Sequence, residues 1–222
     1  MQNAVIGKAI YNYLLFLPNN YSSRLNWPVI LYLHGIGAKG EYLEVLKANG
    51  LPSFLEEHPG LPFIVISPQC PTDQDWSSDR LGRFLDEMRA KYRIDTDRTY
   101  LTGIGEGASA AWRLALSQPE RFAALAPVCG GGNPHEACNL RDLPVWIFHG
   151  ARDRIVPISD AQGMVLALKL CGGNVNFTIY PDAAHDSWTA TYRNPRLYAW
   201  FLEHTRTGFS EPAFDPVADD LE

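Results

Sequence analysis

The feature that most constrains this sequence is a nearly unbroken apolar run at residues 28–33, Pro-Val-Ile-Leu-Tyr-Leu. A run without alternating polar positions is typical of a strand that is buried on both faces of a sheet. Residues 63–67, Phe-Ile-Val-Ile-Ser, form a second such run. Strands covered on both faces occur where helices pack above and below the sheet, so the two runs indicate a layered α/β protein.

Further strand-like and helix-like segments alternate along the chain. We expect strands at residues 11–17, 98–102, 123–128, 144–149 and 175–180, and helices at 81–92, 159–171 and 196–204. The alternation predicts a single α/β domain over residues 1–207, with a mostly parallel central sheet flanked by helices. In such a sheet, functional residues lie in the loops beyond the carboxyl ends of the strands.

The composition restricts the partners of this chain. Its 222 residues carry a net charge of −6 without a cluster of Lys or Arg, which argues against nucleic acid. No apolar run reaches the ~18 residues of a membrane helix. The N-terminus lacks a basic segment followed by an apolar block, so we expect a cytoplasmic protein, although a secreted chain whose leader was removed would look the same. Residues 208–222 are acidic and aperiodic, which predicts a peripheral or disordered tail.

Four cysteines, Cys70, Cys129, Cys138 and Cys171, show no spacing typical of a zinc site. We expect buried or loop thiols, with a bridge between Cys129 and Cys138 as an open alternative. No other metal-ligand spacing appears either. The sequence therefore predicts a protein without a metal or other cofactor.

Residues 102–110, Thr-Gly-Ile-Gly-Glu-Gly-Ala-Ser-Ala, join an expected strand to a helical segment. A glycine-rich turn in this position occurs in dinucleotide-binding folds and in hydrolases. The Gly-x-Gly-x-x-Ala match fits the first class. However, the next strand ends in Cys129 and three glycines instead of the acid that would hold a ribose, and the motif lies mid-chain. We therefore favour the hydrolase turn, Gly-x-Ser-x-Gly, with Gly105 at its middle position.

Three other strand ends support the hydrolase hypothesis. The strand at 28–33 runs into a glycine-rich turn, residues 34–37, which can aim a backbone N–H at a developing oxyanion. Asp153 lies shortly after the strand at 144–149, and His185 lies after the strand at 175–180. The chain order of turn, aspartate and histidine matches that of Ser-Asp-His hydrolases.

Seven segments together resemble α/β-hydrolases of the esterase and peptidase type, similar to the phospholipase/carboxylesterase and dienelactone-hydrolase groups. They span nearly all of residues 10–205 and read YLLFLPNNY, WPVILYLHGIG, FIVISPQCP, RTYLTGIGEG, FAALAPVCGGG, FHGARDRIVP and YPDAAHDSW. The resemblance implies an α/β-hydrolase fold and hydrolysis of a small-molecule carboxylic ester through an acyl-enzyme. In that family the histidine, here His185, takes the proton of the nucleophile, and the aspartate, here Asp153, holds the imidazole. The oxyanion donors would be the backbone N–H groups of Ile36 and Glu106.

The sequence departs from that family at the nucleophile, where Gly105 stands in place of serine. We therefore expect a carboxylesterase-type serine hydrolase that is nearly inactive as written. Because Asp153 and His185 are retained, we favour a deliberate or recent change of serine to glycine. The alternatives are a natural ligand-binding relative without turnover, and a peptidase or thioesterase of the same fold.

Other residues compete for the catalytic roles. Ser109 lies one helical turn beyond Gly105, and we expect it to pack within the helix instead of attacking. Cys129 and Glu106 are weaker candidates, the first as a nucleophile and the second as a group that activates water together with the histidine. Asp186 rivals Asp153 as the orienting carboxylate, but adjacent residues rarely reach the ring correctly.

Three further residues follow strand ends or flank the expected histidine. Gln69, Trp76 and Trp188 are predicted to line the substrate pocket. His34 and His149 precede glycines at strand ends, and we expect both to stabilise turns without acting in catalysis.

Overall fold

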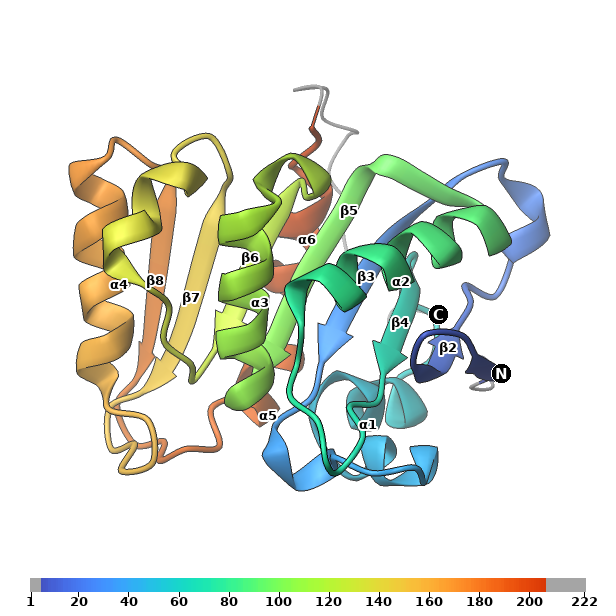
Figure 1. The fold of residues 1–222 in the computed structure, drawn as a ribbon, viewed down its shortest axis with the longest axis horizontal. Helices are drawn as coiled ribbons and strands as arrows, with labels where there is room; N and C mark the ends of the chain where they lie inside the picture. The colour runs from blue at the N-terminus through green and yellow to red at the C-terminus, as the bar shows by residue number, and fades with distance from the viewer. Residues whose placement is uncertain (1–4, 207–222) are drawn as a thin grey trace, which may run out of the picture.

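The computed structural model describes residues 5–206. In these residues eight strands form one sheet in the order β1-β2-β4-β3-β5-β6-β7-β8 (Figure 1). The strands are β1 (Val5–Lys8), β2 (Asn12–Phe16), β3 (Trp27–Leu33), β4 (Ile64–Pro68), β5 (Ile94–Ile104), β6 (Ala124–Val128), β7 (Val145–Gly150) and β8 (Val175–Tyr180). The α-helices are α1 (Gly50–Glu57), α2 (Ser78–Lys91), α3 (Glu106–Ser117), α4 (Ile158–Leu170), α5 (Trp188–Tyr192) and α6 (Pro195–Leu202).

The sheet is mostly parallel, as predicted. Strands β3 to β8 pair in parallel, whereas β2 pairs antiparallel with both β1 and β4. The carboxyl ends of the six parallel strands therefore lie along one edge of the sheet. That edge carries the turns in which the sequence places the functional residues.

Helices cover both faces of the sheet. Figure 1 shows α2, α3 and α4 in front of the strands, with α6 behind them. Alternate residues of β3 enter two separate cores, so that Val29 and Leu31 pack on the side of α2 and α3, and Ile30 and Tyr32 on the side of α1 and α6. Burial on both faces explains why β3 is apolar at every position.

Several elements differ from the expected pattern. β1, α1 and α5 were not anticipated, and 3₁₀ turns fill the connections as η1 (Tyr21–Ser23), η2 (Ile36–Ala38), η3 (Leu43–Ala48), η4 (Pro119–Arg121) and η5 (Pro134–Leu140). β5 begins four residues earlier than expected. The acidic tail at 208–222 lies outside the described residues, and the domain limit at residue 207 stays a prediction.

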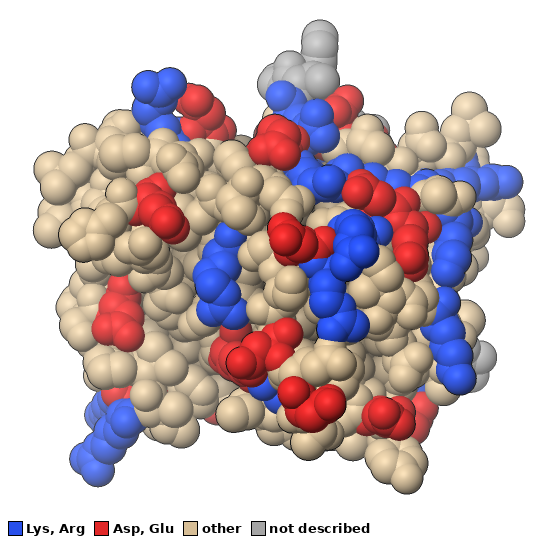
Figure 2. Space-filling model, viewed as in Figure 1, with Lys and Arg blue, Asp and Glu red and all other residues tan. Residues whose placement is uncertain are grey.

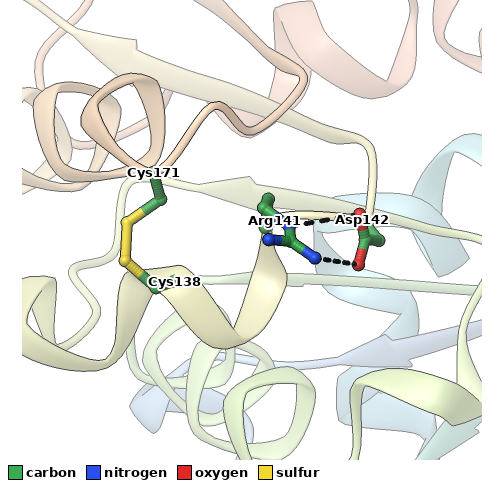
Figure 3. Close-up of a disulfide and its surroundings, with 4 residues drawn as sticks. All are labelled: Cys138, Arg141, Asp142 and Cys171. Carbon is green, nitrogen blue, oxygen red and sulfur yellow. Dashed lines mark hydrogen bonds and ion pairs between the residues drawn. A yellow bond between two sulfur atoms is a disulfide. The ribbon is translucent and has the colours of Figure 1, made fainter.

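A disulfide joins Cys138 in η5 to Cys171 at the end of α4 (Figure 3). This pairing corrects two expectations. Cys138 and Cys171 are not free thiols, and Cys129, which is a buried free thiol, does not bridge to Cys138. The two bonded residues are 33 positions apart, and only the packing of η5 against α4 brings them together. Structural disulfides are rare in cytosolic proteins, and the expected cytoplasmic location stays a prediction.

Charges of both signs are mixed over the face formed by α2, α3 and α4. Figure 2 shows Lys and Arg interspersed with Asp and Glu on this face, without a continuous basic patch. Within residues 5–206 no helix is long and apolar enough to cross a membrane.

Candidate active site

Gly105 alone separates the end of β5 from the start of α3. Its backbone lies at φ 53° and ψ −117°, a left-handed conformation that costs a residue with a side chain roughly 1–3 kcal/mol. The Gly105 N–H donates to the carbonyl of Val128 at 3.0 Å, and its carbonyl accepts from the N–H of Ser109 at 3.0 Å. The turn is therefore sharp and fixed from both sides, and it presents residue 105 at the edge of the sheet.

The start of α3 packs directly against the end of β3. A Cβ on Gly107 would lie 2.1 Å from the Leu33 carbonyl oxygen and 2.4 Å from that of His34, so only glycine fits there. A Cβ on Gly35 would likewise come within 3.3 Å of the Ile104 carbonyl oxygen. This close approach places the turn after β3 beside the turn after β5.

His185 and Asp153 meet across the loops that follow β8 and β7. The His185 Nδ1 lies 2.8 Å from Asp153 Oδ2. The other carboxylate oxygen accepts the backbone N–H groups of Ile155 and Val156 at 2.9 and 3.0 Å. His149, which is fully buried, places its Nε2 3.3 Å from Asp153 Oδ2 and 2.9 Å from the Val156 carbonyl. The carboxylate is therefore fixed by groups on three sides.

These contacts determine the charge of Asp153. Burial alone would raise the pKa of its carboxyl, but the hydrogen bonds from His185, Val156 and Ile155 together hold that pKa below its ordinary value. The rival carboxylate, Asp186, instead accepts from the backbone N–H and the hydroxyl of Thr189. Of the two acids, Asp153 is the one that contacts the imidazole.

The other imidazole nitrogen faces the turn after β5. A Cβ placed on Gly105 would lie 3.3 Å from His185 Nε2. The ring stands edge-on to Trp188, with 5.4 Å between the two ring centroids. The His185 side chain is 22% exposed, so it remains accessible from the cavity.

A cavity of about 390 Å³ opens over these groups. Its wall includes the predicted residues Ile36, Gly105, Glu106, His185 and Trp188. Most of the lining is apolar or backbone. The cavity therefore suits a small ligand with an apolar group next to the imidazole.

Two residues predicted for the pocket do not line it. Gln69 is buried, and its side-chain nitrogen donates to the carbonyls of Ala38 and Tyr42 at 3.0 and 3.2 Å. Trp76 is also buried, and its indole N–H donates to the carbonyl of His34 at 3.3 Å. Both side chains therefore donate to backbone carbonyls of the loop after β3 and hold that loop in place.

Several residues that line the cavity were not predicted from the sequence. Ile155 and Val156 follow Asp153 directly, and their apolar character next to a candidate acid was an available signal. Asn49 lines the same cavity from the segment before α1, and nothing in its sequence context indicated this position. Ser109 also lines the cavity, from the first turn of α3.

The rival nucleophiles are poorly placed or poorly ionised. Ser109 lines the cavity and does not simply pack within the helix, as was expected, but its backbone N–H is bonded to the Gly105 carbonyl, so it lies in the first turn of α3 and not at the tip of the turn. Cys129 is fully buried, and burial raises the pKa of its thiol to about 12. A thiol in that state is a weak nucleophile near neutral pH.

His34 stabilises a turn, as expected, whereas His149 contacts the Asp153 carboxylate in addition to the turn at Val156. His34 Nε2 accepts the backbone N–H of Cys70 at 3.0 Å, and its Nδ1 lies 2.7 Å from the Gly35 carbonyl. Burial lowers the pKa of His34 to about 4. The imidazole is therefore neutral near pH 7 and acts as a structural link between the loops after β3 and β4.

The arrangement provides a histidine–carboxylate pair, two adjacent turns with backbone N–H groups and an apolar cavity. Such a set can move a proton and stabilise negative charge on an oxygen. Among residues 5–206 no group of three or more His, Cys, Asp and Glu side chains is positioned to hold a metal ion.

The mostly parallel sheet flanked by helices, with this site at its carboxyl edge, is an α/β-hydrolase fold. The chain belongs to the phospholipase/carboxylesterase family of hydrolases, which matches residues 66–194.

Individual relatives agree with this family. The chain is 27% identical over 163 residues to the bifunctional acetylxylan esterase/xylanase XynS20E of Neocallimastix patriciarum, a match that covers 68% of this chain and 22% of the relative. It is similar to the crystal structure of a thermostable esterase, with a TM-score of 0.77, 28% identity and coverage of 91% of this chain and 63% of that one. A ferulic acid esterase shares the fold, with a TM-score of 0.68, 15% identity and coverage of 90% and 96%. The chain spans 12% to 61% of the length of four curated relatives that it matches.

Proposed function

We propose that this chain is a serine-hydrolase scaffold for small carboxylic esters in which Gly105 occupies the position of the nucleophile. The observation that carries the proposal is that the His185 imidazole lies between the Asp153 carboxylate and the turn at residue 105. The first two are 2.8 Å apart, and the third would place a Cβ 3.3 Å from His185 Nε2. A serine at residue 105 would bring its hydroxyl within reach of that nitrogen.

The mechanism of the serine form follows from this order of groups. The hydroxyl attacks the ester carbonyl while His185 Nε2 takes its proton, and Asp153 stabilises the imidazolium. The backbone N–H groups of Ile36 and Glu106 donate to the oxyanion. His185 then protonates the departing alcohol, and water, activated by the same imidazole, releases the acid. The form with Gly105 lacks the attacking oxygen, so it forms no acyl-enzyme.

The size and lining of the cavity support a small ester. A space of about 390 Å³ with mainly apolar walls accommodates a short or aromatic acyl group. The names of the relatives describe esterases, including one for acetylxylan. Peptides and thioesters use the same arrangement of groups and are the nearest alternative substrates.

Hydrolysis of p-nitrophenyl acetate and butyrate tests the proposal. We expect Gly105→Ser to hydrolyse both esters, and we expect His185→Ala in that background to remove the gain. The unchanged protein is expected to retain at most the ~10³–10⁴-fold acceleration over water that binding and oxyanion donors provide. His58→Ala is the matched control, because His58 stacks on Phe54 outside the cavity.

A second function, ligand binding without turnover, is favoured by one observation, namely that the cavity is intact beside a turn that carries glycine at residue 105. A protein that binds a ligand without turning it over would also keep its cavity and carry no nucleophile at this turn. In that case Gly105→Ser would remain folded and cleave no ester, thioester or amide, and the esterase proposal would be refuted.

A further inference from the structure

Lys39 connects the two turns that lie beside each other at the candidate site. It follows η2 directly, and its backbone N–H donates to the carbonyl of Ile36 at 3.3 Å. Its ammonium nitrogen lies 2.8 Å from Glu106 Oε1, on the first residue of α3, and 2.8 Å from Asp75 Oδ1. The Lys39 side chain is 12% exposed and that of Glu106 is 25% exposed, whereas that of Asp75 is 87% exposed, so the contact with Glu106 is the more shielded of the two.

Glu106 explains why a cation is needed at this place. A carboxylate in the first turn of a helix is favourable for the helix, because the backbone N–H groups there carry partial positive charge. The same carboxylate opposes negative charge that develops on an oxygen bound at the Glu106 N–H. Among the described residues, Glu106 Oε2 is buried and accepts no hydrogen bond, whereas Oε1 lies next to the Lys39 ammonium. Lys39 is therefore the cation that offsets the negative charge of this carboxylate.

The rest of the loop after β3 is already fixed from the protein interior. The side chain of Gln69 holds the carbonyls of Ala38 and Tyr42, and the Gly40 N–H donates to the Cys70 carbonyl at 3.0 Å. These bonds connect the loop to the end of β4. The ion pair of Lys39 instead connects it across the site to α3.

We propose that Lys39 is a positioning residue that holds the turn of Ile36 against the start of α3 and neutralises Glu106. Both backbone N–H groups then face one carbonyl oxygen, and the negative charge of Glu106 does not oppose the oxyanion. This inference rests on the function proposed above. It adds a role for a residue that touches neither the substrate nor the reacting atoms.

The inference is tested by steady-state ester hydrolysis in the Gly105→Ser background. Lys39→Met is expected to lower kcat on the order of tenfold to a hundredfold, with little change in KM, because it displaces oxyanion donors without altering the acyl cavity. Lys47→Met is the matched control, since Lys47 also contacts two carboxylates, Glu44 at 3.1 Å and Glu56 at 3.6 Å, away from α3. It is expected to leave kcat unchanged.

A double substitution shows whether Lys39 acts by offsetting the charge of Glu106 or only by supporting the fold. Glu106→Gln breaks the same ion pair but removes the negative charge, so we expect its kcat to lie between those of the parent and Lys39→Met. The double variant Lys39→Met/Glu106→Gln is expected to be more active than Lys39→Met alone, although it has lost both partners. A purely structural role would make the double variant the less active of the two. If Lys39→Met does not fold, two milder variants test the same point. Lys39→Arg is expected to retain most of kcat, whereas Glu106→Gln is expected to lose part of it. A lower kcat for Lys39→Arg than for Glu106→Gln overturns the inference.

The possible failures are distinguishable. An active Gly105→Ser protein in which Lys39→Met behaves like Lys47→Met overturns the role of Lys39 and leaves the esterase proposal standing. A folded Gly105→Ser protein without hydrolytic activity overturns the proposed function, and the role of Lys39 fails with it.

Discussion

His185 Nε2 lies 3.3 Å from the point that a Cβ on Gly105 would occupy, and no other heavy atom of the imidazole except Cε1 comes within 4 Å of that point. The distance is shorter than an ordinary van der Waals contact. It shows that the imidazole is already directed at residue 105 in a protein that carries no side chain there. Substitutions at this position therefore affect both stability and chemistry.

The first prediction concerns the stability cost of a side chain at residue 105. Because the backbone lies at φ 53°, Gly105→Ser and Gly105→Ala are both expected to lower the free energy of unfolding by roughly 1–3 kcal/mol. Urea denaturation measures this change. Gly37→Ala is the control, because its Cβ would meet no atom within 4 Å and its φ is not left-handed. Equal stability of all four proteins would contradict the strained turn.

The second prediction distinguishes the two candidate carboxylates. In the Gly105→Ser background, Asp153→Asn is expected to lower kcat by roughly 10⁴, because the amide no longer holds the imidazole in the required tautomer. Asp186→Asn is expected to change kcat little, since Asp186 bonds to Thr189 and not to the ring. A larger loss from Asp186→Asn than from Asp153→Asn would reverse the assignment.

The third prediction is a pH dependence that originates at His34. Its folded-state pKa is about 4, below the ordinary value of 6.5, so the unfolded chain binds more protons between these two pH values. The stability that His34 contributes is complete above pH 6.5 and is lost as the pH falls toward 4, by up to about 3 kcal/mol. Unfolding free energies measured at pH 7 and pH 4.5 give the change. His34→Gln is expected to show a smaller loss over this interval, and an identical loss would exclude His34 as the cause.

The fourth prediction concerns the disulfide between Cys138 and Cys171. Its loop of 33 residues corresponds to about 3–4 kcal/mol in the chain-entropy treatment. Dithiothreitol is expected to lower the Tm of the parent protein. The Cys138→Ser/Cys171→Ser variant is expected to melt at a lower temperature that no longer responds to the reductant. A parent Tm that is insensitive to full reduction would show that the bond adds nothing to stability.

The central strands could be predicted because they depend on local pattern, and the turn at Gly105, Asp153 and His185 follow strand ends in the structure as they do in the sequence. The apolar run at 28–33 corresponds to β3, which is buried on both faces. α1 was missed because Gly50–Glu57 is only eight residues long and begins with Gly-Leu-Pro. The disulfide could not be predicted, since four cysteines allow several pairings and only folding brings η5 to α4.

The direction of side chains at strand ends was the least predictable feature of the site. Gln69 and Trp76 follow β4 as expected, yet both point back at the loop after β3. Lys39 and Glu106 lie 67 positions apart, so their ion pair depends on how closely α3 packs against the end of β3. Sequence patterns locate a turn but do not determine which of its side chains face the cavity.

We propose that residue 105 is the position of nucleophilic attack and that His185 activates the attacking group. Covalent labelling by diisopropyl fluorophosphate, followed by intact-mass measurement and peptide mapping, tests this assignment. We predict one phosphoryl adduct on Gly105→Ser, located at residue 105, with release of fluoride, and no adduct on the unchanged protein or on Gly105→Ser/His185→Ala. An adduct on Ser109 or elsewhere, or a folded Gly105→Ser protein that resists labelling, would rule out residue 105 as the nucleophile position.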